Sequence, residues 1–226
     1  MAKLQNVYRE YSMQSLRGKS AKQKFIREYK DVRVLTYAAL LNGNEKPSQC
    51  GGKLVDKYYQ FSAIHKVTGQ KVIFYLGCHC GEELMQMLSI PIDSIRFFNP
   101  FKTRLNAINN NTSNTSKDRQ MQPTRLANEL FEIINIIYMG LNLKDTHILD
   151  DMIMDLRENI GKEPEAYKFA SINTILGKYK KTISIILDEL QQNNQPFKKF
   201  DFTQSRDYFL KEYLIKNNRE NEKINF

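Results

Sequence analysis

The sequence predicts an α+β protein in which N-terminal helices and a β-hairpin are followed by an all-α bundle. Two segments rich in β-branched and aromatic residues flank a short glycine-containing turn in the first half, which predicts the hairpin. After residue 123, apolar residues recur at every third or fourth position, as on one face of a helix. The apolar share of 41% and the aromatic share of 11% also exclude a wholly disordered chain.

Two helices are expected before the hairpin. Residues 3–17 carry apolar side chains at helical spacing, and Gly18 is expected to end this helix. Ser20 is a suitable N-cap for a longer helix over residues 21–41, because its hydroxyl can accept a hydrogen bond from a free N–H group of the first turn. Aromatic residues gather on one face of this second helix and Lys and Arg residues on an adjacent arc, so it is predicted to be a basic amphipathic helix.

The β-hairpin is the clearest local pattern in the chain. Residues 54–66 and 70–77 are its predicted strands, and residues 67–69 supply a tight turn in which Gly69 can adopt a positive φ. A short helix over residues 80–88 should follow the second strand.

Composition divides the chain into two predicted domains. Residues 1–105 form a basic domain of mixed α and β structure, and residues 124–226 form a helical domain. Residues 106–123 between them are rich in Asn, Ser and Thr and lack periodicity, which favours a polar linker or mobile loop. In the helical domain, breaks are expected at Gly161 and Gly177, and short loops should join antiparallel neighbours.

The net charge of +9 is carried entirely by the first half. Residues 1–123 hold 19 Lys and Arg against 9 Asp and Glu, whereas residues 124–226 hold 15 against 16. Such asymmetry indicates nucleic acid or another acidic partner, although a charge that only keeps the protein soluble is the alternative. The residues expected to bind nucleic acid through its phosphates are Arg17, Lys19, Lys22, Lys24, Arg27, Lys30, Arg33, Lys53, Lys57, Lys66 and Lys71. Of these, Lys22, Arg27, Lys30 and Arg33 are expected to be exposed on the basic helix.

The cysteines cluster around the hairpin. All three, with two of the three histidines, lie within residues 50–80, and Cys-Gly steps place flexible backbone beside the thiols. Over residues 48–88 the arrangement loosely resembles a treble-clef zinc finger, which implies one structural zinc held by Cys50, Cys78, Cys80 and His79, with His65 as the alternative histidine. The usual paired Cys-x-x-Cys is missing, so a zinc-free hairpin with buried, reduced cysteines is the competing interpretation.

No catalytic signature is present in the sequence. It contains no phosphate-binding loop, dinucleotide fingerprint, nucleophile elbow or His-Glu-x-x-His motif. His147, Asp151, Asp155 and Glu158 share one face of a predicted helix, a spacing that suits a divalent cation or a His–Asp pair. A solvated acidic face is the simpler interpretation, so the sequence favours a protein that is not an enzyme.

A cytoplasmic protein with no membrane partner is expected. No apolar run reaches the length of a membrane span, and the first residues lack the apolar core of a signal peptide.

Two hypotheses of function follow. In the first, the basic N-terminal half binds nucleic acid or a nucleoprotein complex. In size and composition, including its wealth of Asn, Ile and Lys, the chain resembles small proteins that phages and plasmids use in a bacterial host cell, among them inhibitors of host defence such as anti-CRISPR proteins. In the second, the protein is an adaptor or structural protein whose basic half meets an acidic protein surface, with no nucleic acid.

Overall fold

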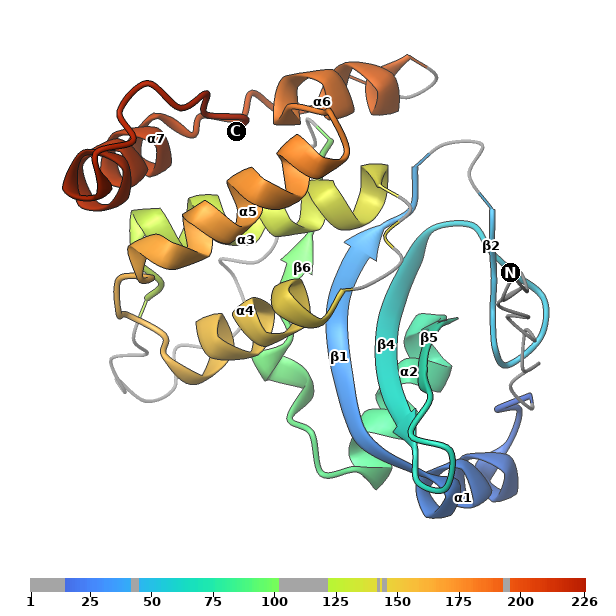
Figure 1. The fold of residues 1–226 in the computed structure, drawn as a ribbon. Coiled ribbons are helices and arrows are strands. Elements are labelled where there is room, and N and C mark those ends of the chain that lie inside the picture. The colour runs from blue at the N-terminus through green and yellow to red at the C-terminus, as the bar shows by residue number, and fades with distance from the viewer. Residues whose placement is uncertain (1–14, 42–44, 102–121, 142, 144–145, 193–195) are drawn as a thin grey trace, which may run out of the picture.

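The computed structural model describes residues 15–226 with five internal gaps (Figure 1). The described ranges are 15–41, 45–101, 122–141, 143, 146–192 and 196–226. They form an α+β fold in which a mixed four-stranded sheet with its own helices precedes a helical region. Within the part of the chain that the structure describes, no helix combines the length and the apolarity needed to cross a membrane.

The main sheet has the strand order β5-β4-β1-β6. Antiparallel pairs join β1 to β4 and β4 to β5, and β6 runs parallel to β1. The β4–β5 pair confirms the expected hairpin, and Gly69 in its turn has a φ of 68°. The strands are β1 (Tyr29–Ala39), β4 (Lys57–His65), β5 (Lys71–Leu76) and β6 (Phe97–Phe98), while β2 (Lys46–Pro47) and β3 (Lys53–Leu54) form a separate two-stranded ladder.

The prediction of one helix over residues 21–41 is wrong beyond Glu28. Helix α1 covers Lys19–Glu28, and the chain then continues as β1. Val32, Val34 and Thr36 are β-branched and fit a pleated strand better than a helix, and β1 is paired along both of its edges. The expected helix over residues 3–17 lies mostly outside the described residues, and residues 15–17 are not helical.

The prediction of helices after residue 123 is confirmed. Five α-helices follow, and two of them are capped by threonine: the hydroxyl of Thr124 accepts from the N–H of Ala127, and that of Thr182 from the N–H of Ile185. They are α3 (Arg125–Gly140), α4 (His147–Glu158), α5 (Ala166–Lys178), α6 (Ile183–Gln191) and α7 (Thr203–Phe209), which continues through single turns over Leu210–Leu214 and Ile215–Asn217.

Smaller differences from the sequence pattern remain. Helix α2 (Cys78–Met87) begins two residues earlier than expected. Gly177 lies inside α5, so the break between α5 and α6 comes a few residues after it. The expected linker at residues 106–123 lies almost wholly outside the described residues, and the division into two domains stays a prediction.

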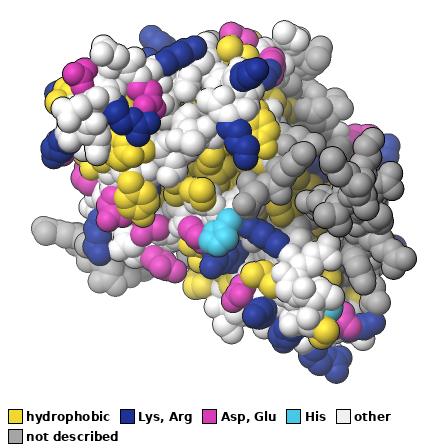
Figure 2. Space-filling model, viewed as in Figure 1, with side chains coloured by type: hydrophobic (Ala, Val, Ile, Leu, Met, Phe, Trp, Pro, Cys, Tyr) yellow, Lys and Arg dark blue, Asp and Glu magenta, His cyan; other side chains and the backbone are white. Residues whose placement is uncertain are grey.

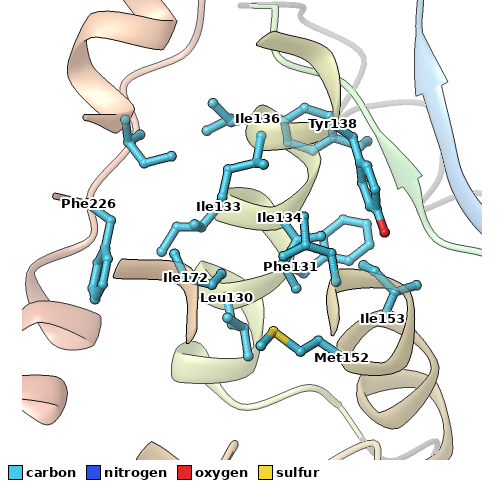
Figure 3. Packing of buried hydrophobic residues seen from close by; sticks show 14 of the residues in the cluster. Leu130, Phe131, Ile133, Ile134, Ile136, Tyr138, Met152, Ile153, Ile172 and Phe226 are labelled. Atoms are coloured by element: carbon cyan, nitrogen blue, oxygen red, sulfur yellow. The ribbon is translucent and has the colours of Figure 1, made fainter. Parts of the chain in front are cut away.

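Two buried clusters lie on opposite faces of the sheet. Because neighbouring residues of a strand point to opposite faces, Leu35 and Tyr58 join the cluster formed with the C-terminal helices, whereas Val34 and Tyr59 join the cluster under α1 and α2. Figure 3 shows the centre of the first cluster, where α3 supplies most of the side chains. The labelled residues are Leu130, Phe131, Ile133, Ile134, Ile136 and Tyr138 of α3, with Met152 and Ile153 of α4, Ile172 of α5 and Phe226.

Gly140 tests the close packing of α3 against α6. A Cβ at this position would lie 2.1 Å from Cγ2 of the buried Ile186, so Gly140→Ala should lower the free energy of unfolding. Overpacking of this kind costs about 1–3 kcal/mol, more than the gain of up to about 1 kcal/mol from removing glycine from a helix. Chemical denaturation measures the change.

Gly177→Ala is the matched control. Its Cβ would meet only Nδ2 of Asn225 at 3.7 Å, an ordinary contact, so this variant should be as stable as the original protein or more stable. Equal effects of the two substitutions would contradict the close approach of α3 and α6.

Candidate nucleic-acid interface

The structure places the eleven predicted phosphate-contacting residues in different environments. Three of them, Lys22, Arg33 and Lys71, bind carboxylates of distant segments. The other eight have exposed side chains: Arg17, Lys19, Lys24, Arg27, Lys30, Lys53, Lys57 and Lys66.

The prediction that Lys22 is exposed is wrong. Its side chain is 0% exposed, and its ammonium donates to Oε2 of Glu83 in α2 at 2.8 Å. The reason is the position of α1, whose Phe25 packs in the cluster that also contains Leu84 of α2. Lys22 therefore faces α2 rather than solvent and joins the two helices.

Arg33 and Lys71 attach the sheet to α4. Arg33 of β1 binds Asp151, and Lys71 of β5 binds Asp150. The side chain of Asp150 is only 2% exposed and also accepts from the hydroxyl of Tyr138 at 2.7 Å. Because the buried Asp150 neutralises Lys71, Lys71 contributes little to a surface for an external anion. The Arg33–Asp151 pair is solvent-exposed, with side chains 38% and 48% exposed, and is weaker.

The acidic face of α4 is part of the same set of contacts. Asp151 pairs with Arg33 and also lies 2.7 Å from Nδ1 of His147. Asp155 binds Lys168 of α5. These carboxylates hold segments of the chain together, which accounts for their spacing along α4.

The exposed cations gather over α1, as the basic surface at the lower right of Figure 2 shows. Arg17, Lys19, Arg27 and Lys30 lie on this helix or directly beside it. Lys66, in the turn of the hairpin, donates to the carbonyl oxygens of Ile26 and Arg27 at 3.0 and 2.8 Å and caps the C-terminal end of α1.

The remaining exposed cations have neighbours of their own. Lys24 lies 3.8 Å from Glu28 in α1, Lys53 binds Glu45, and the ammonium of Lys57 lies 5.2 Å from the centre of the Phe97 ring. The two ion pairs are solvent-exposed and weak, so Lys24 and Lys53 can exchange their carboxylates for a phosphate.

An open cleft of about 550 Å³ lies between the segment that precedes α1 and the N-terminus of α2. It brings together residues from both sets that the sequence singled out, the cations and the cysteine–histidine group. The lining residues are Arg17, Ser48, Cys50, Gly51, Gly52, Lys53, Leu54, Gly77, Cys78, His79 and Cys80.

Backbone groups make this cleft suitable for an anion. Helix α2 begins at Cys78, and its N-cap residue, Gly77, has no side chain to accept from the first N–H groups. Free N–H groups and the helix dipole make such an end a ready site for phosphate. Gly51 and Gly52 have φ values of 92° and 79°, a left-handed backbone conformation that other residues rarely adopt. Arg17 and Lys53 add two positive charges to the lining.

The cysteines differ in their surroundings. The buried Cys50 donates from Sγ to the carbonyl oxygen of Leu16 at 3.2 Å. Burial, together with a hydrogen bond to Cys80, raises the pKa of Cys50 to about 12, so this thiol keeps its proton at neutral pH. The Sγ atom of Cys78 lies 3.8 Å from the hydroxyl oxygen of Tyr37.

The expected zinc site stays a prediction. Among the described residues, no three His, Cys, Asp or Glu side chains are grouped so that they could hold a metal ion. His65, the alternative ligand, ends β4 beside the hairpin turn and lies edge-on to Tyr29 with ring centres 5.0 Å apart. The cleft is at the other end of the hairpin, next to Gly77.

The sequence pattern does not reveal that three glycines lie together in this cleft. The sequence shows Gly51 and Gly52 as neighbours of Cys50 and Gly77 as the end of the second hairpin strand, although glycine next to the start of a helix is also typical of phosphate sites. The structure shows that the three glycines line one cleft.

Charge reversal at Lys22 tests its burial. Lys22→Glu should lower the thermal midpoint strongly, because it places a carboxylate in the buried position beside Glu83. Lys19→Glu, three residues earlier at an exposed position, should leave the midpoint nearly unchanged. Thermal unfolding followed by circular dichroism compares the two, and equal midpoints would place Lys22 on the surface after all.

The contact between Lys22 and Glu83 should also make the stability of the protein depend on pH. The hydrogen bond from Lys22 lowers the pKa of Glu83 below 4.5, so the stabilisation by this carboxylate is complete above pH 4.5 and is lost as pH falls through the lower, folded-state pKa. Glu83→Gln should therefore melt below the original protein at pH 7, with a difference that shrinks below pH 4.5. The exposed Glu220 supplies the control: Glu220→Gln should show no such pH-dependent difference. A difference that grows on acidification would contradict the contact.

Comparison with known proteins gives one match. No curated protein and no solved structure matches the chain. The family model described as "Uncharacterised conserved protein UCP028583" matches residues 15–212, a region that includes the sheet and helices α1 to α7. Because the match spans most of the 226 residues, the chain belongs to this family.

Proposed function

We propose that the protein binds nucleic acid, free or within a nucleoprotein complex, and that it does so without catalysis. The observation that carries the proposal is the cleft at the N-terminus of α2, where Arg17, Lys53 and the uncapped start of the helix meet. Each of these groups attracts an anion, and phosphate suits all of them.

The cations over α1 favour a polymer over a small anion. Helix α1 has 10 residues and is about 15 Å long at 1.5 Å per residue. Along one strand of a duplex this length corresponds to about four phosphates at 3.4 Å each. Lys19, Arg27 and Lys30 therefore extend the positive surface from the cleft over several nucleotides.

The proposed contacts are to the sugar–phosphate backbone. Contacts of this kind fix position but do not read the base sequence, so binding should depend steeply on salt and only weakly on sequence. A role as an inhibitor of a nucleoprotein machine, in a bacterial host of a phage or plasmid, would use the same surface.

The double variant Arg17→Glu with Lys53→Glu tests the cleft. It should bind labelled single-stranded RNA and duplex DNA at least tenfold more weakly than the original protein. Because two phosphate contacts are removed, the slope of log affinity against log salt should flatten by about 1 to 2 units. Fluorescence anisotropy across a salt series measures both quantities.

The matched control is Lys199→Glu with Lys211→Glu. These lysines are exposed in the helical region, and their reversal changes the net charge by the same amount. The control should retain most of the affinity. If both double variants weaken binding equally, net charge rather than the cleft is responsible.

A pull-down with and without nuclease separates nucleic acid from an acidic protein partner. Loss of the partners after nuclease treatment supports the proposal. A protein partner that survives nuclease, together with no binding of RNA or DNA at low salt, would contradict it and favour the adaptor hypothesis.

A further inference from the structure

A second cleft, of about 260 Å³, lies among the ends of helices away from the basic surface. It is formed by the short 3-10 turn Ile92–Ser94 with the residues after it, the start of α3 and the end of α4. Most of its lining is apolar: Pro123, Ala127, Phe131, Ile153, Leu156 and Ile160, with Asp93, Ser94, Arg96 and Arg157 as the polar members.

Arg157 carries an unsatisfied donor in this lining. Its Nη1 donates to the carbonyl oxygen of Val34 in β1, but its Nη2 is buried and has no hydrogen-bond partner in the described ranges. Burial lowers the pKa of Arg157 to about 10. Buried donors are almost always paired in folded proteins, and an unpaired guanidinium nitrogen is costly. A hydrogen-bond acceptor suits this nitrogen, and an anionic acceptor suits the guanidinium charge best.

Arg96 adds a second guanidinium group to the same cleft. Its Cζ lies 4.4 Å from the centre of the Phe131 ring, and its Nη1 donates to Oδ1 of Asn128. Burial disfavours the charged form of Arg96 and lowers its pKa, while the carboxylate of Glu132 lies near enough to favour that form; Glu132 is shared with Lys198. The described lining holds one carboxylate, that of Asp93, so the two arginines give the cleft a net positive charge.

We propose that this cleft binds a small apolar carboxylate, namely a straight-chain fatty acid of about eight carbons. The carboxylate would accept from Arg157 and Arg96, since guanidinium groups match carboxylates in geometry and charge. The chain would lie against Ile153, Leu156 and Ile160. A volume of about 260 Å³ equals that of about nine water molecules in the liquid, which suits a ligand of this size.

The apolar walls decide between classes of anion. A phosphate monoester carries a charge of about −2, more than the net charge of the lining, in which Asp93 offsets one of the two arginines, and burying an unpaired charge is unfavourable. A neutral alcohol could fill the cleft but would give Arg157 no charged acceptor. Nη2 of Arg157 is buried, so the carboxylate can reach it only if the side chains around it move on binding.

Calorimetric titration with octanoate tests the proposal, with octan-1-ol and octylamine as probes of equal chain length. Octanoate should bind saturably and at least tenfold more tightly than octan-1-ol, and octylamine should not bind. Equal affinity for octanoate and octan-1-ol, or no saturable binding of octanoate, would overturn the proposal.

Two substitutions locate the binding site. Ile160, which is 39% exposed at the rim, can be replaced by Glu without loss of core packing, and Ile160→Glu should weaken octanoate binding at least tenfold. Ile148→Glu, at a position of α4 that is 53% exposed and not part of the lining, should bind octanoate like the original protein. Octanoate binding that Ile160→Glu leaves unchanged would place the ligand elsewhere and overturn the proposal.

Arg157→Met tests the anchor itself. This variant should lose the preference for octanoate over octan-1-ol while still binding both weakly, because the apolar walls remain. A preference that survives the substitution would assign the carboxylate to another group and contradict the role of Arg157. Circular dichroism confirms that the variant is folded, because Arg157 also contacts β1.

Discussion

The second half of strand β1, residues 34–39, is largely buried on both faces, and the rest of the fold is arranged around it. Strand β4 pairs along one edge, and β6 pairs with Tyr37 and Ala38 on the other. Val34 packs toward α1 and α2, while Leu35 packs toward the C-terminal helices. The helical region also bonds to this strand through polar groups: Arg157 of α4 donates to the carbonyl oxygen of Val34, and Thr36 pairs with Asn135 of α3. A shift of β1 by one residue would exchange its two faces. The strand therefore fixes the positions of α1 and α4, and with α4 the second cleft.

The same enclosure explains which elements the sequence pattern reveals. A strand buried on both faces has no alternation of apolar and polar residues, so residues 29–39 look like the continuation of the helix before them. The β4–β5 hairpin is predictable because its turn at Gly69 and its β-rich strands are local features. The helices after residue 123 are predictable for the same reason, since their periodicity and threonine caps need no tertiary partner.

The candidate site could be predicted only in part. The cysteines and glycines flank the hairpin, so their meeting at one end follows from the hairpin itself. The burial of Lys22 depends on Glu83, 61 residues away, and the neutralisation of Arg33 depends on Asp151, 118 residues away. No local pattern identifies such partners. The same holds for Arg157, whose hydrogen-bond acceptor in β1, the carbonyl oxygen of Val34, lies 123 residues away.

The ion pairs between sheet and helices have a consequence for fragments of the chain. In the whole protein, Asp151 and Asp150 neutralise Arg33 and Lys71, and the helices cover the face of the sheet that contains Leu35 and Tyr58. A fragment that ends before α4 would expose two additional cations beside an uncovered apolar surface. Such a piece would adsorb polyanions and aggregate for reasons that do not exist in the intact molecule. Truncation would thus overstate the affinity of the N-terminal half for nucleic acid, and only substitutions in the full chain measure it.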